Sequence, residues 1–509
     1  MLESYLQAVT DLEDRFAAAP GRRDLMVALA LFLTSFCALA VAAPEGFASA
    51  DAAVYLQQIR EADFQSRPTH VGYYVLGWLW TAVLGASEKA LNLMSAGFGA
   101  LAVALIWLHA SRLMQDRRAA GFAVAAALTH SLLVQNALHA EVYMAEAALL
   151  LAALHLWLRK RHVAAGLLLA LAGLVTPSAV FVAPAFVLLR PRWRPLAVLV
   201  ATAGLGVALG IAPLGTDYFS GGRGLLSGAS AHLGLLGGIK KEGMEVVLGA
   251  SATLLWVAAG VVVAAVRSFL RPWLLALCVA WAAGFVLGER FGDVPVQLPL
   301  HLWACCLVGV AIGGLPVFLK AFTKAKKLAF WSGASALAAA PPALVFLFRH
   351  ELQAAAGLPA SAWLTLALVV LLAGLACSLV SEPRRGLEIF GAITVLATLL
   401  GSLGQARALH RGVVDYRDAV LAKTTPEPLA IGGWSPGILF EHYRYGESYT
   451  DNWIDRRELD ESARLRLESA LAEGREIWLL DGPLPSEIAD RLEGAEGEPR
   501  GPVTVLGAR

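Results

Sequence analysis

Residues 159–194 read RKRHVAAGLLLALAGLVTPSAVFVAPAFVLLRPRWR, and this stretch decides the topology of the chain. Thr176-Pro177-Ser178 divides its apolar middle into halves of about 13 residues, each reaching only about 20 Å against a hydrocarbon core of about 30 Å. Basic clusters flank the stretch at both ends, and such clusters mark the cytoplasmic side of a membrane. The pattern therefore predicts a short helical hairpin that returns the chain to its starting side.

The composition places most of the chain in a bilayer. Of its 509 residues, 57% are hydrophobic and 16% are charged, a balance typical of polytopic membrane proteins. The 41 basic and 40 acidic residues nearly cancel, and no basic block with interleaved aromatic residues is present, so no nucleic acid partner is expected. All five cysteines fall within apolar runs, which argues against a disulfide framework.

Apolar runs of membrane-spanning length recur along the chain. Besides the hairpin they lie near 24–43, 90–111, 119–136, 141–158, 195–213, 245–266, 272–288, 297–319, 328–348, 361–380 and 386–403. With the N-terminus inside, 17 basic residues fall on the inner face and eight on the outer face, which supports about 13 helices with the C-terminus outside. Residues 70–86 are then expected to form a helix at the outer interface, with Tyr73, Tyr74, Trp78 and Trp80 as interfacial aromatics.

The tail differs in composition from the rest. Residues 428–433 and 476–481 have the pattern of short buried strands, and 436–445 and 456–473 that of helices. The expected fold class is therefore mainly α: a transmembrane helix bundle over 1–403 followed by a small extracytoplasmic α/β domain over 404–509.

Asp51 follows the first apolar span, in Ser49-Ala50-Asp51-Ala52-Ala53-Val54-Tyr55. Apolar residues recur there at i, i+3, i+4 and i+7, which predicts a short amphipathic helix with one face on the membrane and Asp51 at its N-terminus. A carboxylate at the interface can deprotonate an acceptor hydroxyl, so Asp51 is the candidate catalytic base. Aspartate is also a favoured N-cap, so a structural cap is the alternative, and both roles can coexist.

The order of these features resembles the GT-C glycosyltransferases, and within them the protein O-mannosyltransferase-like group. The resemblance rests on Asp51, on Arg67-Pro68-Thr69-His70-Val71-Gly72-Tyr73-Tyr74, and on Glu141-Val142-Tyr143. That group reads His-Pro-Pro-Gly where this chain has Arg67 to Gly72, and Val54 stands where its Asp-x-x-Glu motif has the second acid. The resemblance implies a helical membrane enzyme that takes a polyprenyl-phosphate-linked sugar.

Further polar residues are expected to bind the substrate. Glu141 and His139 lie where the fourth span starts, and an acid at such a position usually faces a water-filled cavity. For Glu141 the alternative is stabilisation of the helix N-terminus through its dipole. His70, Tyr55 and Tyr143 complete the expected sugar-binding set, although His70 can equally be an interfacial histidine in contact with water.

The leaving lipid phosphate calls for a cation on the outer face. Arg223 and Arg290 are the expected residues, chosen from a set that also includes Lys240, Lys241 and Arg349. No spaced ligand cluster indicates a metal or another cofactor. Binding of a divalent cation is an open alternative, in which Asp51, Glu141 and Asp293 would come together as its ligands.

The leading interpretation is an inverting glycosyltransferase at the outer face of a bacterial inner membrane, with Ala/Arg/Gly-rich usage as the indication of a bacterium. Its partners would be membrane lipid, the lipid-linked donor and an acceptor (protein, lipid or glycan) that the sequence does not identify. A transporter or lipid flippase is the alternative, disfavoured by the lack of repeat symmetry and the scarcity of charges in mid-helix. A non-catalytic scaffold would need far fewer spans.

Overall fold

A computed structural model describes residues 2–17, 20–64, 70–212, 253–287, 298–347, 359–421, 427–432, 434–445, 452–455, 461–480, 497–500 and 503–506. Its contacts divide the chain into two compact units. The membrane unit comprises Met1–Ala42, Phe64–Leu76 and Leu93–Ala406. The tail unit comprises Ala43–Asp63, Gly77–Asn92 and Arg407–Arg509, so two segments from between α2 and α5 pack with the C-terminal tail.

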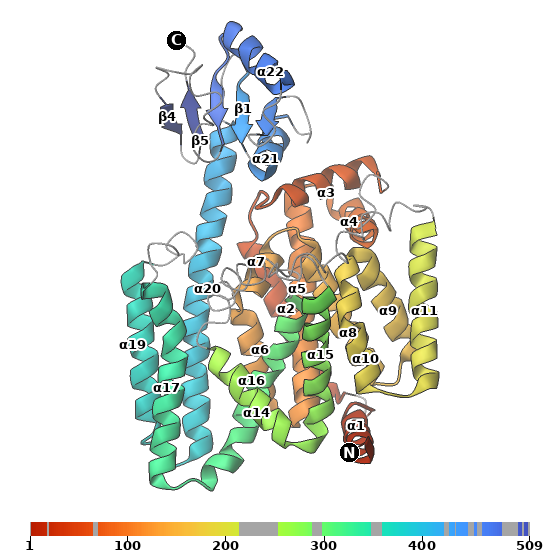
Figure 1. Cartoon of the computed structure of the whole chain (residues 1–509), viewed down its shortest axis with the longest axis vertical. Coiled ribbons are helices and arrows are strands. Elements are labelled where there is room, and N and C mark those ends of the chain that lie inside the picture. The colour runs from red at the N-terminus through yellow and green to blue at the C-terminus, as the bar shows by residue number, and fades with distance from the viewer. Residues whose placement is uncertain are drawn as a thin grey trace. The chain divides into compact units, whose positions relative to one another are not determined.

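Helices dominate the first half of the described chain (Figure 1). They are α1 Leu2–Ala17, α2 Arg22–Ala42, α3 Ala50–Glu61, α4 Val71–Leu84, α5 Glu88–Met114, α6 Arg117–Thr129, α7 Ser131–Leu138, α8 Val142–Leu158, α9 His162–Val175, the 3-10 helix η2 Pro177–Val182, α10 Ala183–Leu189 and α11 Trp193–Ile211. The second half continues with α14 Leu254–Val266, η6 Ser268–Leu270, α15 Arg271–Leu287, α16 Leu298–Lys320, α17 Lys324–Leu347, α19 Ala360–Cys377 and α20 Pro383–Leu421.

Among the described residues, six helices are long and apolar enough to cross a bilayer, namely α2, α5, α11, α16, α17 and α20. The number rises to eight if each of two bent pairs is one span: α6 with α7, and α14 with Ser268–Ala283. Shorter apolar helices occupy other predicted positions, namely α8, α9, Pro177–Leu189 and Ser361–Cys377, and α4 is a further short apolar helix, at the position predicted to be interfacial. The chain is thus the mainly helical, polytopic membrane protein that the sequence predicts, while the count of about 13 spans stays a prediction.

The predicted hairpin is present, and one tryptophan shows it. The Trp157 ring lies 5.0 Å, centroid to centroid, from the ring of His162, the first residue of α9. Trp157 Nε1 also donates a 2.9 Å hydrogen bond to the carbonyl oxygen of Phe186 in α10. The start of α9 and the end of α10 therefore lie at the same end of the membrane unit, as the flanking basic clusters predict.

Small residues allow the membrane helices to pack closely. A Cβ atom on Gly260 of α14 would lie 2.1 Å from the carbonyl oxygen of Leu307 in α16, and one on Gly309 of α16 would lie 2.6 Å from that of Ala119 in α6. Only glycine permits such backbone contacts. In lipid the hydrophobic effect does not drive helices together, so close packing of this kind stabilises their association instead. α16 is accordingly buried along most of its length.

The interfacial helix expected over 70–86 corresponds to α4, with one correction. Tyr73 and Tyr74, expected as interfacial aromatics, are both fully buried. The exposed stripe of α4 is formed instead by Val75, Trp78, Leu79 and Val83. The aromatic composition indicates an interface helix but does not show which face of that helix meets the lipid.

The tail contains a five-stranded sheet with strand order β2-β1-β3-β5-β4 among the described residues. β1 Leu429–Gly432 pairs in parallel with β2 Trp453–Asp455 and β3 Ile477–Leu479, whereas β5 Val503–Leu506 is antiparallel to β3 and to β4 Gly497–Arg500. The described part of the tail also contains α21 Trp434–Tyr445 and α22 Glu461–Ala472. The two predicted strands and two predicted helices correspond to β1, β3, α21 and α22.

The two faces of this sheet are covered by different helices. Leu429 and Ile431 of β1 belong to a cluster that includes Leu467 of α22. Ala430, between them in sequence, packs in a second cluster with Phe440 of α21. This alternation follows from the two-residue side-chain period of a strand, and it makes the tail a layered α/β fold.

Candidate functional site

The sequence candidates fall in different parts of the structure. Asp51 and Tyr55 belong to the tail unit, and His70 belongs to the membrane unit. His139, Glu141 and Tyr143 also belong to the membrane unit. Arg223 and Arg290 lie outside the described residues. Each group is therefore described within its own unit.

Asp51 lies in the first turn of α3, as predicted, but it does not cap the helix. Ser49 is the N-cap, with extended backbone, and its Oγ accepts a 3.3 Å hydrogen bond from the backbone N–H of Ala52. The sequence could not decide between the two, because serine and aspartate are both good N-caps. With the cap supplied by Ser49, the carboxylate of Asp51 is not needed for that role.

Tyr55 faces the interior of the tail unit. Its side chain is 3% exposed, and it lies on α3 among buried neighbours that include Leu56 and Ile59. α3 packs against α21. The face that the sequence assigns to the membrane is thus protein core, and a substrate role for Tyr55 stays a prediction.

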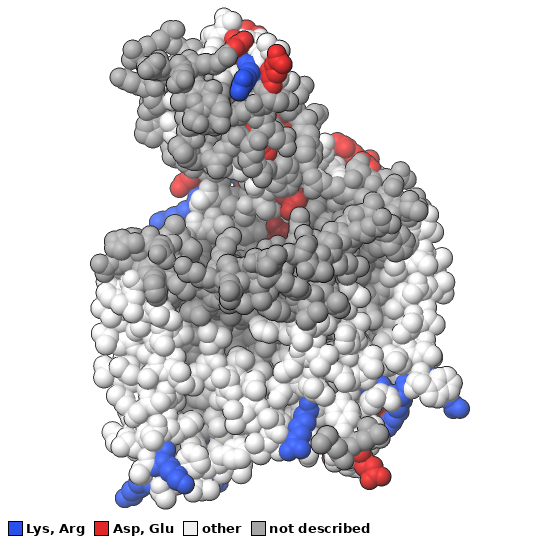
Figure 2. Space-filling model, in the orientation of Figure 1, with Lys and Arg blue, Asp and Glu red and all other residues white. Residues whose placement is uncertain are grey.

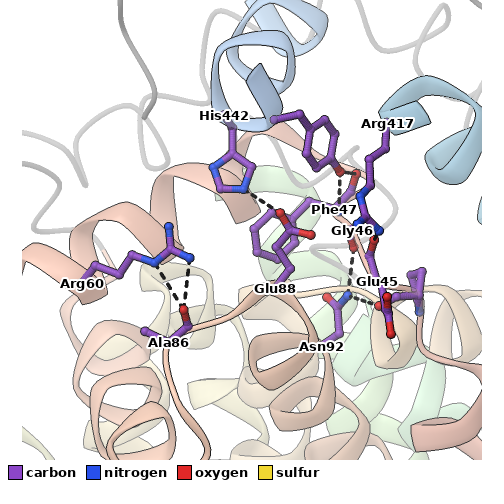
Figure 3. A network of polar contacts seen from close by, with 11 residues as sticks. Glu45, Gly46, Phe47, Arg60, Ala86, Glu88, Asn92, Arg417 and His442 are labelled. Atoms are coloured by element: carbon purple, nitrogen blue, oxygen red, sulfur yellow. Dashed lines mark hydrogen bonds and ion pairs between the residues drawn. The ribbon is translucent and has the colours of Figure 1, made fainter. Parts of the chain in front are cut away.

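Polar contacts fix the chain just before α3 (Figure 3). Asn92, which is fully buried, donates through Nδ2 to the carbonyl oxygens of Pro44 at 3.0 Å and Gly46 at 2.9 Å. Lys89 donates to the carbonyl oxygen of Ala43. Side chains at the start of α5 thereby supply hydrogen-bond donors to the backbone carbonyls of the segment just before α3.

The tail contributes a second set of contacts to the same segment (Figure 3). The Tyr443 hydroxyl accepts a 2.7 Å hydrogen bond from the N–H of Phe47 and donates to its carbonyl oxygen at 3.1 Å. Arg417 donates to the carbonyl oxygen of Glu45, and His442 Nε2 lies 2.9 Å from Glu88 Oε1. Burial is the main cause that raises the pKa of Tyr443, so its hydroxyl stays neutral and keeps both bonds.

Glu141 begins α8 as its N-cap residue, without a side-chain capping bond. Its backbone N–H donates a 3.4 Å hydrogen bond to the Oγ of Ser95. Ser95 and Glu141 both affect the pKa of the buried Tyr73, which places the three residues together. Burial raises the pKa of Tyr73, the bond to Ser95 opposes that rise, and the charge of Glu141 adds to it. Glu141, Ser95 and Tyr73 thus form one polar cluster at the N-terminus of α8. Sequence reasoning named only Glu141 for the site, because Ser95 lies within an apolar span.

His70 contacts the apex of the hairpin. Its Nδ1 lies 2.9 Å from the carbonyl oxygen of Val175, the last residue of α9. Because a carbonyl can only accept, Nδ1 carries the proton in this contact. The start of α4 also packs closely against the end of α9, since a Cβ atom on Gly72 would lie 2.8 Å from the backbone of Leu174 and Val175. This contact gives His70 a structural role, and its expected role in substrate binding stays a prediction.

Glu146 is an acid that sequence reasoning missed. It is 1% exposed within α8, and its Oε1 accepts a 2.8 Å hydrogen bond from the Ser178 hydroxyl. Ser178 in turn lies 3.0 Å from Thr176, at the break between α9 and η2. A single acid inside an apolar helix was the available signal, since such residues are costly in a membrane and usually functional.

His139 and Tyr143 flank Glu141 with different exposure. His139 is 5% exposed and ends α7, while Tyr143 is half-buried in the first turn of α8. Among the residues that the structure describes, no group of three or more His, Cys, Asp or Glu side chains is placed to hold a metal ion. Asp293, the third residue of the open divalent-cation hypothesis, lies outside those residues.

Comparisons with known proteins bear on this arrangement. The sequence model of glycosyltransferase family 87 matches residues 73–291, a segment that contains Tyr73, Ser95, Glu141 and Glu146. No curated protein sequence matches significantly. Two crystal structures of ArnT from Cupriavidus metallidurans share the fold at 14% sequence identity, covering 94% of this chain and 98% of that chain. The TM-score is 0.56 for the apo state and 0.57 for the form bound to undecaprenyl phosphate.

The ArnT-like fold confirms the mainly helical membrane architecture that the sequence predicts. Residues 73–291, fewer than half of the chain, match a glycosyltransferase family, in agreement with the enzyme class expected from the sequence. The matched segment begins within α4 and includes α8 and the hairpin, so it covers both polar clusters of the membrane unit.

Proposed function

We propose that the chain transfers a sugar, with inversion, from a polyprenyl-phosphate-linked donor to an acceptor at the outer face of the membrane. The observation that carries this proposal is the glycosyltransferase match over 73–291. The donor class is supported by the ArnT structure with bound undecaprenyl phosphate, which has a similar fold. We also propose that the chain is closest to the protein O-mannosyltransferase-like group. It would lie in a bacterial inner membrane, with its tail in the periplasm.

In the proposed reaction the acceptor oxygen attacks the anomeric carbon of the sugar. The new C–O bond forms as the bond to the phosphate oxygen breaks, and the electron pair leaves with the polyprenyl phosphate. Asp51 takes the proton of the acceptor hydroxyl, the role of a general base. Its position supports this role, because Asp51 lies in the first turn of α3 while Ser49 is the N-cap.

Glu141 is proposed to orient sugar hydroxyls from the mouth of α8. The bond from its backbone N–H to Ser95 supports that role, because it fixes the main chain from which the carboxylate extends. Arg223 and Arg290 remain the proposed cations for the leaving phosphate. The family match disfavours the transporter or flippase alternative, because it assigns a chemical reaction to the segment that would line a transport path.

Transfer from a radiolabelled polyprenyl-phosphate sugar to native membranes tests the proposal. Asp51→Asn keeps the size of the side chain but removes the base, so transfer should fall about a hundredfold or more while donor binding survives. Glu61→Gln is the matched control, because it changes an exposed acid at the other end of α3 and should leave transfer unchanged. Transfer at the wild-type rate by Asp51→Asn would reject Asp51 as the base and make Glu141 the next candidate. No transfer by the wild-type protein from any such donor would reject the donor class.

A further inference from the structure

A cavity of about 900 Å³ lies in the membrane unit where α5 ends and α6 begins. Its walls come from α1, α2, α5, α6 and the start of α20, and all ten lining residues are charged or polar. Five of them are arginines and three are carboxylates, which leaves an excess of positive charge. The arginines are Arg15, Arg112, Arg117, Arg118 and Arg384.

Ion pairs between different helices hold the walls together. Arg117 Nη2 of α6 lies 3.1 Å from Asp24 Oδ1 of α2. Arg384 Nη2 of α20 lies 2.7 Å from Asp116 Oδ2, and Asp116 is the N-cap of α6. These pairs join three helices, so the cavity is preformed. Glu388 also lies 3.7 Å from Arg118 Nη1 and 2.9 Å from Arg384 Nε. With Glu388 counted, the five arginines still exceed the carboxylates by one charge.

Arg15 lies in the wall of the cavity, with its guanidinium 3.8 Å above the Phe269 ring. Burial and then the charge of Arg267 lower the pKa of Arg15, while the charge of Asp11 raises it. Like charges repel, and an anion bound among the arginines of the cavity would relieve that repulsion. Arginine is also the residue whose planar donors match phosphate oxygens best.

The membrane-facing side next to the cavity is apolar. Leu25, Met26 and Leu29 follow Asp24 on α2 and are 48%, 58% and 52% exposed. Figure 2 shows Lys and Arg side chains at the lower rim of the apolar belt of this unit, as expected of the level of lipid headgroups. An anionic head in the cavity could therefore place its acyl chains along α2, which a soluble phosphate would not need.

We propose that this cavity binds the phosphate-bearing headgroup of an anionic phospholipid from the leaflet at the basic face. About 900 Å³ accommodates such a headgroup, and the arginines supply the donors while the exposed face of α2 receives the chains. The site is separate from the sugar-transfer proposal, and neither depends on the other.

Binding is tested on the purified full-length protein in neutral detergent, titrated with phosphatidylglycerol or phosphatidylcholine and followed by native mass spectrometry. We expect phosphatidylglycerol to bind preferentially. Arg118→Gln should weaken it roughly fivefold and Arg112→Gln with Arg118→Gln about 30-fold, from the usual contribution of each basic residue to anionic lipid binding. Arg118 is exposed, so its single variant should fold even if the double variant does not. Arg194→Gln, at the start of α11 and outside the cavity, is the matched control.

Three outcomes would overturn the proposal. Equal binding of the two lipids would show that charge is not recognised. Equal losses of phosphatidylglycerol binding in Arg118→Gln and Arg194→Gln would mean that any basic residue of this face attracts the lipid. The cavity would then have no special role. Protection from thermal unfolding by inorganic phosphate, without lipid binding, would assign the site to a soluble anion.

Discussion

His442 Nε2 and Glu88 Oε1 lie 2.9 Å apart, so a helix of the C-terminal tail pairs with the first residue of α5. The His442 side chain is 4% exposed and that of Glu88 23%, which protects the contact from solvent screening. This pair joins the tail to the start of α5, and the Tyr443 bonds to Phe47 join it to the segment that precedes α3. The helix that carries Asp51 is therefore positioned by residues more than 350 positions later in sequence.

The first prediction concerns proteolysis of the tail. Cleavage after α20, which ends at Leu421, should yield a compact tail fragment that stays bound to the rest of the chain through these contacts. Tyr443→Phe combined with His442→Ala should release the fragment on washing, whereas Ser469→Ala on the exposed side of α22 should not. Rapid digestion of the wild-type tail to small peptides would contradict a folded tail.

The second prediction concerns topology. Reporter fusions after Arg161 and after Arg194 should both report the cytoplasm, because Trp157 contacts the two ends of the hairpin at once. Fusions within the tail should report the opposite side. Opposite locations for the first two fusions would mean that 163–189 crosses the membrane once.

The third prediction separates the cap of α3 from its proposed chemistry. Ser49→Ala removes the hydrogen bond to the Ala52 N–H and should lower the free energy of unfolding by about 1 kcal/mol, measured as a fall in the thermal midpoint. Asp51→Ala should have a smaller effect on stability but should abolish transfer. The reverse pattern, with stability lost in Asp51→Ala and unchanged in Ser49→Ala, would restore the capping role to Asp51.

The fourth prediction concerns the contact between α4 and the hairpin apex. Gly72→Ala would place a Cβ atom 2.8 Å from the backbone of Leu174 and Val175, so we expect about 1–3 kcal/mol of destabilisation from overpacking. Gly97→Ala is the control, because its nearest neighbour would be 3.9 Å away and alanine is the better helix former. Thermal unfolding in detergent should show a loss for Gly72→Ala and none for Gly97→Ala.

Sequence reasoning predicted the features that depend on charge and apolar length. The hairpin over 163–189 followed from its basic flanks, and the alternation in the tail followed from periodicity. β2, β4 and β5 were missed. β1 and β3 are equally short, but β3 lies within the apolar run Ile477–Leu480, whereas β4 reads Gly-Glu-Pro-Arg and has no apolar signal. The joining of Ala43–Asp63 and Gly77–Asn92 to the tail depends on long-range contacts that local patterns do not encode.

For the candidate site, the sequence identified where polar residues lie better than it identified what each of them does. Asp51 was placed correctly at the start of α3, but its distinction from Ser49 rests on backbone angles. Tyr73 was assigned to the interface because aromatic residues are common there, yet it is fully buried and lies with Ser95 and Glu141. Glu146 was overlooked although a lone acid in an apolar helix is itself a signal.

The break at Thr176 and Pro177 has a consequence for how this sequence can vary. In an uninterrupted helix the Val175 carbonyl would accept from the N–H of Ala179, but that N–H bonds Thr176 instead. The His70 ring supplies the missing donor from a distant segment. Positions 70 and 177 should therefore covary: homologues that lose the proline and straighten the helix would be free to lose the histidine, and those that keep the proline would retain a donor at position 70.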